Sequence, residues 1–182
     1  MHPFSTRYTE SVVPALTAVR QYPSTYLIPK VSKVVVNVGI GDLKENNKAI
    51  DDAAELLGRI VGQRPVRTKA RKAIASFKIR QNMVVGLKVT LRGKRMEDFL
   101  YKFIEVALPR TRDFRGLKAS GITSDGNLNV GIRDAMIFPE AGEDISQLGL
   151  QVTIVSNAAS LEDATRLYKG LGFYFKTSED DR

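Results

Sequence analysis

The residues best suited to chemistry in this sequence are cations gathered in one stretch. Between Glu55 and Glu97 there is no acidic residue, and these 41 residues hold 12 of the 28 Lys and Arg residues. The interval therefore has a charge of +12, whereas the whole chain has +8. Charge of one sign destabilises a compact chain by self-repulsion, so we expect a functional reason for it. The usual reason is a polyanion, because Lys and Arg release the counterions of the phosphates that they neutralise. The stretch favours a nucleic-acid partner over the alternative, a generally basic protein without one.

Two patterns near these cations suit RNA. From Thr68 to Arg80, cations alternate with small and apolar residues, which allow close approach to a phosphate backbone. Phe77 could pack on a sugar or base, or, on an equally weighted alternative, Phe77 and Ile74 only close a hairpin. Asn37 and Thr90 can exchange hydrogen bonds with base edges and 2′-hydroxyls. Because charge alone gives affinity without selectivity, this mixture predicts recognition of one shaped RNA.

Catalytic and metal chemistry have little support. The only His is His2, at a terminus that we expect to be frayed, and there is no Cys. Ser–His and Cys–His pairs and four-ligand zinc sites therefore cannot be built. Gly39 and Gly41 begin a dinucleotide fingerprint, but Lys44 stands where its third Gly should be. We expect no enzyme, no cofactor and no metal. The alternatives are an enzyme that clamps a phosphorylated substrate with Arg and Lys, and a free RNA chaperone.

Length and composition predict one packed domain over residues 1–182. The chain has 43% hydrophobic residues, which is enough for a core. We find no signal peptide and no run approaching ~18 apolar residues, so we expect a cytoplasmic protein without a membrane partner. The polar composition of residues 177–182 predicts a free tail.

Hydrophobic periodicity predicts the elements that position these residues. A period of two predicts strands over 30–39, 65–69, 83–92, 127–132 and 150–156. Helical spacing predicts helices over 11–20, 50–61, 96–108 and 160–171. The first helix starts near Ser11 or kinks at Pro14, because proline fits only a first turn. These elements predict an α+β fold with helices on one face of an antiparallel sheet, RNA on the other face, and a long basic hairpin loop.

Several long strings resemble the bacterial form of large-subunit ribosomal protein L5. They are TKARKAIASFKIRQ (68–81), GLKVTLRGKRM (86–96), PRTRDFRGL (109–117) and IFPE (137–140). VSKVVVNVGIG (31–41) and GQRP (62–65) match in the same order and spacing, so the resemblance covers nearly the whole chain. It implies a structural α+β protein of the large subunit's central protuberance that holds 5S rRNA, in the cytoplasmic ribosome.

The resemblance also implies three sites. The N-terminal half binds 5S rRNA through the sheet face and its margins, namely Lys33, Asn37, Gln63, Arg64, Lys88, Thr90 and Arg92. The arm over 68–81 reaches toward P-site tRNA through Lys69, Arg71, Lys72, Ser76, Phe77, Lys78 and Arg80. The loop-rich portion 109–149 faces the small-subunit head, where a bridge to protein S13 would use Arg110, Arg112, Arg115, Glu143 and Asp144. Large-subunit rRNA is the remaining implied partner. Pro14, Tyr174 and the short loop 141–149 depart from the family's usual pattern.

Overall fold

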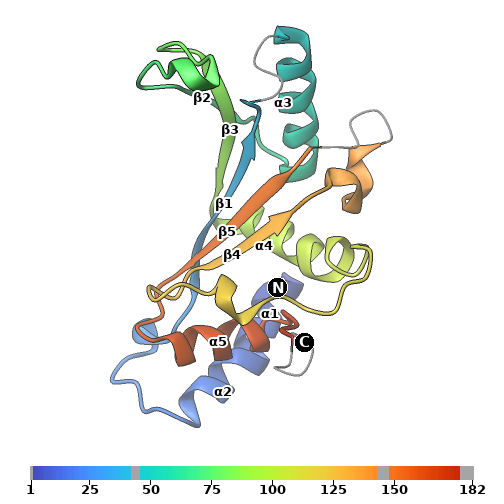
Figure 1. The fold of residues 1–182 in the computed structure, drawn as a ribbon. Coiled ribbons are helices and arrows are strands. Elements are labelled where there is room, and N and C mark those ends of the chain that lie inside the picture. The colour runs from blue at the N-terminus through green and yellow to red at the C-terminus, as the bar shows by residue number, and fades with distance from the viewer. Residues whose placement is uncertain (1, 42–45, 143–147, 177–182) are drawn as a thin grey trace. The chain divides into compact units, whose positions relative to one another are not determined.

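A five-stranded antiparallel sheet with helices forms the fold, as Figure 1 shows. The computed structural model describes residues 2–41, 46–142 and 148–176. The strands are β1 (Val31–Gly39), β2 (Val66–Lys69), β3 (Val84–Leu91), β4 (Leu128–Ile132) and β5 (Leu150–Ser156), in the order β2-β3-β1-β5-β4. The α-helices are α1 (Pro3–Arg7), α2 (Val13–Thr17), α3 (Asn47–Val61), α4 (Gly93–Lys102) and α5 (Leu161–Gly170). The predicted α+β class and the antiparallel sheet are confirmed.

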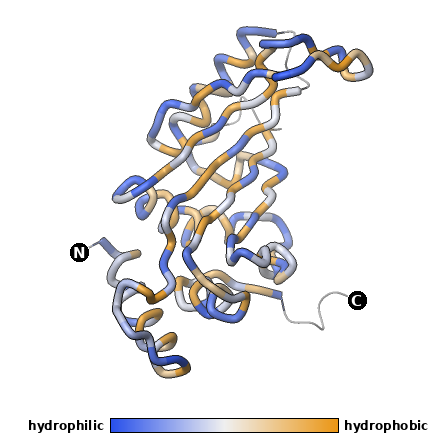
Figure 2. The backbone as a smooth tube through the Cα atoms, turned by 90° about the vertical axis from the view of Figure 1, so that its left-hand side faces the viewer, coloured by the Kyte–Doolittle hydropathy of each residue, from blue (hydrophilic) through white to orange (hydrophobic). Residues whose placement is uncertain are grey.

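Four strands, β1, β3, β4 and β5, have one buried and one wetter face, because side chains alternate along them, whereas β2 has no buried residue. On β1, Val34, Val36 and Val38 are buried, while Lys33 and Asn37 lie on the opposite face and are half-buried. The alternation of hydrophobic and hydrophilic residues along the strands is visible in Figure 2. The period of two therefore predicted which residues point away from the core.

The chain divides into two compact units. The first comprises Met1–Val34, Arg92–Val130 and Thr153–Arg182, and the second comprises Val35–Leu91 and Gly131–Val152. In the first unit α1 packs on α4, and α2 packs on α5. Tyr168 of α5 is buried there, and its hydroxyl donates to the backbone oxygens of Gly126 (2.8 Å) and Ile154 (3.1 Å). Burial raises the pKa of the Tyr168 hydroxyl to about 12.

The second unit holds α3 beside the β2–β3 hairpin. The buried face of α3 consists of Ile50, Ala53, Leu56, Leu57, Ile60 and Val61. Asn46 caps the helix by accepting a hydrogen bond from Ala49 N at 3.2 Å. The helix ends where Gly62 adopts a left-handed conformation with φ of 69°, which glycine adopts without steric cost. The sequence allowed an end near Gly58 or Gly62, and the structure has it at Gly62; the helix begins three residues before the predicted start.

The N-terminal segment corrects two predictions. Helical structure starts at Pro3, because His2 Nδ1 accepts a hydrogen bond from Phe4 N at 3.3 Å and caps α1. His2 Nε2 also lies 3.0 Å from Asp98 Oδ1, so the terminus is not frayed at this residue. A π-helical segment, Tyr8–Val12, separates α1 from α2, and Pro14 lies in the first turn of α2. The start near Ser11 is therefore wrong, and the interruption lies at Tyr8–Val12, immediately before the helical turn that contains Pro14.

Candidate nucleic-acid interface

Polar side chains form a surface on the wetter face of the sheet in the second unit. We define this sheet surface as Asn37, Gln63, Lys88 and Thr90. β1 and β3 are neighbours, and Ile40 N donates to Val85 O at 3.2 Å. Counting three residues from this contact in an antiparallel pair places Asn37 opposite Lys88. Among the described residues, neither the Asn37 amide nor the Thr90 hydroxyl forms a hydrogen bond, so both are available to a ligand.

Gln63 joins this surface through a tertiary hydrogen bond. Its side-chain Nε2 donates to the backbone oxygen of Thr90 at 3.4 Å. The turn after α3 brings Gln63 to β3, although 27 residues separate it from Thr90 in sequence. The structure thus brings together four of the residues that the sequence implied for 5S rRNA.

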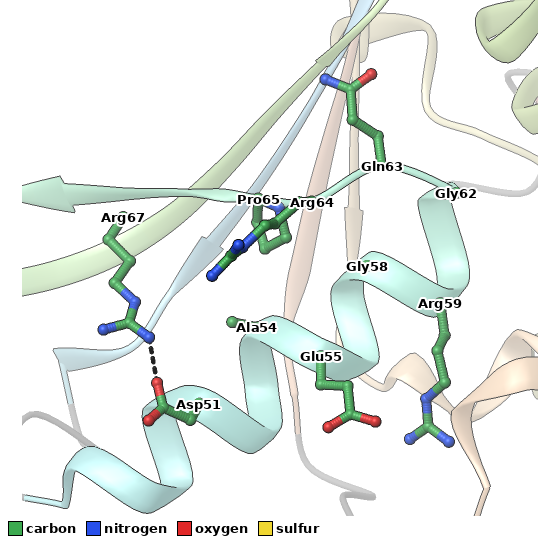
Figure 3. Close-up of a pocket in the computed structure, with 10 residues that line it drawn as sticks. All are labelled: Asp51, Ala54, Glu55, Gly58, Arg59, Gly62, Gln63, Arg64, Pro65 and Arg67. Carbon is green, nitrogen blue, oxygen red and sulfur yellow. Dashed lines mark hydrogen bonds and ion pairs between the residues drawn. The ribbon is translucent and has the colours of Figure 1, made fainter.

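The other three residues implied for 5S rRNA lie elsewhere. Lys33 and Arg92 belong to the first unit, Lys33 on the wetter face of β1 and Arg92 at the N-cap of α4. Arg64 extends from the chain in a different direction from Gln63 and lies in a groove beside α3 (Figure 3). Consecutive residues of the string GQRP therefore serve two different surfaces.

Close backbone approach fixes the strand pairing beneath this surface. Gly86 lies opposite Thr68 in the β2–β3 register. A Cβ at Gly86 would lie 2.7 Å from Thr68 Oγ1 and 3.1 Å from Val38 O, which no side chain tolerates without movement. The small residue in GLKVTLRG therefore lets β2, β3 and β1 approach one another at this position.

The basic arm is a closed hairpin beyond β2 and β3. Ala70 N donates to Met83 O at 2.8 Å, and Ile74 and Ile79 exchange backbone hydrogen bonds of 2.9 and 3.1 Å. The tip is a 3₁₀ turn, Ala75–Phe77, followed by Lys78 in a left-handed conformation. Every residue that the sequence implied for tRNA is exposed here, namely Lys69, Arg71, Lys72, Ser76, Phe77, Lys78 and Arg80.

The two apolar side chains of the arm remain accessible. Ile74 closes the hairpin with its backbone, yet its side chain is 45% exposed. Phe77 is 64% exposed. The backbone of Ile74 closes the hairpin, and the exposed ring of Phe77 leaves contact with a sugar or base as a prediction.

We define the third basic segment as residues 109–118; it lies in the first unit and forms backbone hydrogen bonds with the C-terminal segment. Leu117 N donates to Tyr174 O at 2.7 Å, and Lys176 N donates to Leu117 O at 2.9 Å. Gly116, with φ of 108°, lies against this pair, where a Cβ would come within 2.8 Å of Lys176 N. Arg110 and Arg115 lie at the two ends of this segment, with Arg112 between them. Glu143, Asp144 and residues 177–182, to which the sequence assigned roles, lie outside the described residues.

A groove of about 670 Å³ lies between α3 and β2 (Figure 3). We call it the α3–β2 groove. It is lined by Asp51, Ala54, Glu55, Gly58 and Arg59 of α3 and by Gly62, Gln63, Arg64, Pro65 and Arg67 after it. Arg67 forms an ion pair with Asp51 across the groove. Asp51, Arg59 and Arg67 were not among the site residues inferred from sequence, because only the turn at 62–65 brings β2 back beside the helix.

The described residues also show what other sites and segments this part of the chain contains. Within 2–41, 46–142 and 148–176, no three His, Asp or Glu side chains are grouped so that they could hold a metal ion. In the same part of the chain no helix has both the length and the apolar character needed to cross a membrane.

Comparison with known proteins decides the family. Residues 24–80 match the family described as Ribosomal protein L5, and residues 84–175 match the model of the C-terminal part of the same ribosomal family. The chain belongs to the L5 family of ribosomal proteins. It is 45% identical over 174 residues to the large ribosomal subunit protein uL5 of Lactobacillus delbrueckii subsp. bulgaricus, covering 94% of this chain and 97% of that protein. It is 46% identical to the same protein of Halothermothrix orenii (93% and 96%) and of Symbiobacterium thermophilum (93% and 96%).

Membership of the L5 family confirms the coarse functional prediction. The protein is a structural component of the large ribosomal subunit and not an enzyme, which also gives its location in the cytoplasmic ribosome. The resemblance identified from the strings between Val31 and Glu140 is therefore correct. The enzyme alternative, which needed a catalytic base or a metal, is not supported.

Proposed function

We propose that the protein binds 5S rRNA with the sheet surface, touches P-site tRNA with the basic arm, and helps to bridge the subunits through its third basic segment. The single observation that carries the first part is the pairing of Asn37 with Lys88 on neighbouring strands, beside the unbonded hydroxyl of Thr90. Short polar groups supply selectivity, and the cation supplies attraction to phosphate. Within the first unit, Lys33 of β1 and Arg92 at the N-cap of α4 are further proposed contacts for 5S rRNA.

The basic arm suits a second RNA. Its hairpin projects cations from a backbone that pairs only with itself between Ala70 and Met83 in the described part of the chain. The accessible face of Phe77 adds a surface on which a sugar or base can stack. These features support contact with P-site tRNA, with large-subunit rRNA as the neighbour of the remaining basic surface.

The third basic segment suits a partner on the small-subunit head. Arg110, Arg112 and Arg115 lie on a loop whose end is fixed by pairing of Leu117 with the C-terminal segment. A fixed loop loses little conformational entropy when it binds. Protein S13 is the proposed partner, and the proposal rests on these three cations.

A competition titration tests the proposed 5S rRNA site. The protein is titrated with 5S rRNA at two salt concentrations, with total tRNA as competitor. We expect tight binding that resists the competitor. Thr90→Ala should lower the affinity for 5S rRNA, whereas Thr9→Ala, an exposed helical control, should not. Weak binding that tRNA abolishes and salt erases would indicate a general polyanion surface and contradict the proposal.

A further inference from the structure

We propose that the α3–β2 groove is a second contact for the same RNA and binds a phosphate of its backbone. This inference rests on the proposed 5S rRNA binding, because the groove begins beside Gln63. It adds Arg59 and Gly58 to Arg64, which the resemblance already implies for 5S rRNA, and all three lie outside the sheet surface.

The charges of the groove favour an anion. Three arginines, Arg59, Arg64 and Arg67, are among its lining residues, against two acidic residues, Asp51 and Glu55. In Figure 3 the side chains of Arg64 and Arg67 extend on one side of the helix, while Arg59 extends on the other, as Glu55 does. Arg67 is paired with Asp51, whereas Arg59 and Arg64 form no ion pair within the described residues and are exposed. A guanidinium offers a planar fork that matches phosphate geometry. The unpaired positive charge therefore fits a phosphate.

The orientation of two consecutive residues links the groove to the sheet surface. In Figure 3, Gln63 extends from the chain away from α3, while Arg64 extends beside Pro65 at the groove. Their Cα atoms are about 3.8 Å apart, as in any trans peptide. One RNA strand that reaches Gln63 is thus within reach of the Arg64 guanidinium.

Gly58 gives independent support, because the fold itself does not require glycine there. It lies inside α3, where glycine lowers helix stability relative to alanine. A Cβ at Gly58 would meet Pro65 Cδ at 3.8 Å and Gln63 O at 3.9 Å, which are ordinary contacts. Its backbone does not adopt a positive φ. The missing side chain leaves room on the wall of the groove, and this room is the feature that an approaching phosphate backbone needs.

A protein partner fits the groove less well. Apolar and aromatic side chains dominate the centre of protein–protein interfaces. Among the residues that line this groove only Ala54 and Pro65 are apolar apart from glycine, and neither is aromatic. The lining therefore supplies charge and space but no apolar anchor, which favours RNA.

The first test compares two charge-neutralising variants on the same helix. Arg59→Gln removes a groove cation, and Lys48→Gln removes an exposed cation of α3 outside the lining. Full-length proteins are titrated with 5S rRNA at several salt concentrations. We expect Arg59→Gln to weaken binding on the order of tenfold. The slope of log K against log salt should fall by about 1. Equal behaviour of the two variants would overturn the groove site, while the response of Thr90→Ala would separately decide the sheet surface.

The second test uses the opposing effects expected of Gly58→Ala. The variant should unfold at a higher temperature than the wild type, because alanine favours the helix, and should bind 5S rRNA more weakly, because the methyl group occupies the groove. Unchanged affinity with higher thermal stability would overturn the proposal. The last measurement adds millimolar inorganic phosphate to the wild type and to Arg59→Gln. If phosphate stabilises only the wild type, while Arg59→Gln binds RNA as well as the wild type does, the groove binds a small anion and the proposal of an RNA contact is overturned.

Discussion

The side-chain amide of Gln63 donates a hydrogen bond to the backbone oxygen of Thr90 and so joins the end of α3 to β3. This bond holds one polar residue of the sheet surface directly beside another. A ligand that forms a hydrogen bond with the Thr90 hydroxyl therefore lies close to the Gln63 amide as well.

We predict that Gln63→Ala weakens 5S rRNA binding by about 1–3 kcal/mol, because an RNA group is left without its partner. Gln63 is uncharged, so the salt dependence of binding should not change. Filter binding at several salt concentrations checks both statements, with Gln21→Ala, an exposed residue of the connector before β1, as the control. A fall in the salt slope would show that Gln63 acts on phosphates indirectly and would contradict direct recognition.

Lys72→Ala tests the separation between the basic arm and the sheet surface. Lys72 is exposed near the tip of the arm. We expect isolated 5S rRNA binding to be nearly intact and P-site tRNA to dissociate faster from ribosomes that contain the variant, by up to about tenfold. Lys169→Ala, an exposed cation on α5, is the matched control. A loss of 5S affinity in Lys72→Ala without any loss in Thr90→Ala would reverse the assignment of the two surfaces.

Gly116→Ala should destabilise the protein strongly. The glycine has φ of 108°, and the added Cβ would lie 2.8 Å from Lys176 N and 3.0 Å from Phe175 C. We expect a loss of about 2–3 kcal/mol, since both the backbone strain and the clash oppose the native pairing. Thermal unfolding should show a midpoint lower by roughly 4–12 °C. Gly131→Ala, whose Cβ would have no neighbour within 4 Å, should change the midpoint little.

The buried hydroxyl of Tyr168 should make the protein less stable in strong alkali. Its folded pKa of about 12 lies above its ordinary value of 10.0, so the neutral form is favoured by folding. The corresponding stability, about 2–3 kcal/mol, is fully present below pH 10 and is lost as the pH rises through 12. Denaturant unfolding of the wild type and Tyr168→Phe across this range measures it. Phe should reduce the dependence on pH, leaving the part due to Tyr8 and Tyr22, whose pKa values burial also raises. By leaving two carbonyl oxygens without the hydroxyl donor, it should also lower stability at neutral pH.

The spacing of hydrophobic residues was sufficient to predict the strands of the sheet and the longer helices from the sequence. The alternation around Val36 and Val89 located β1 and β3 and their wetter faces, and helical spacing located α3. The first helix was misplaced because its start depends on a tertiary contact of His2 with Asp98, which no local pattern encodes. The α3–β2 groove was missed for a similar reason, since only folding brings Arg67 to Asp51.

The cations of β2 also protect the free protein. β2 is an outermost strand of the sheet, and its unpaired backbone is a template on which a second copy could add a strand. It has four residues, follows Pro65 and bears Arg67 and Lys69, and its register with β3 shifts between Thr68 and Lys69, where β3 has one extra residue, Val85. Short length, like charges and a bulge each discourage edge-to-edge aggregation. The composition that suits RNA therefore also keeps newly made copies apart until the RNA is available.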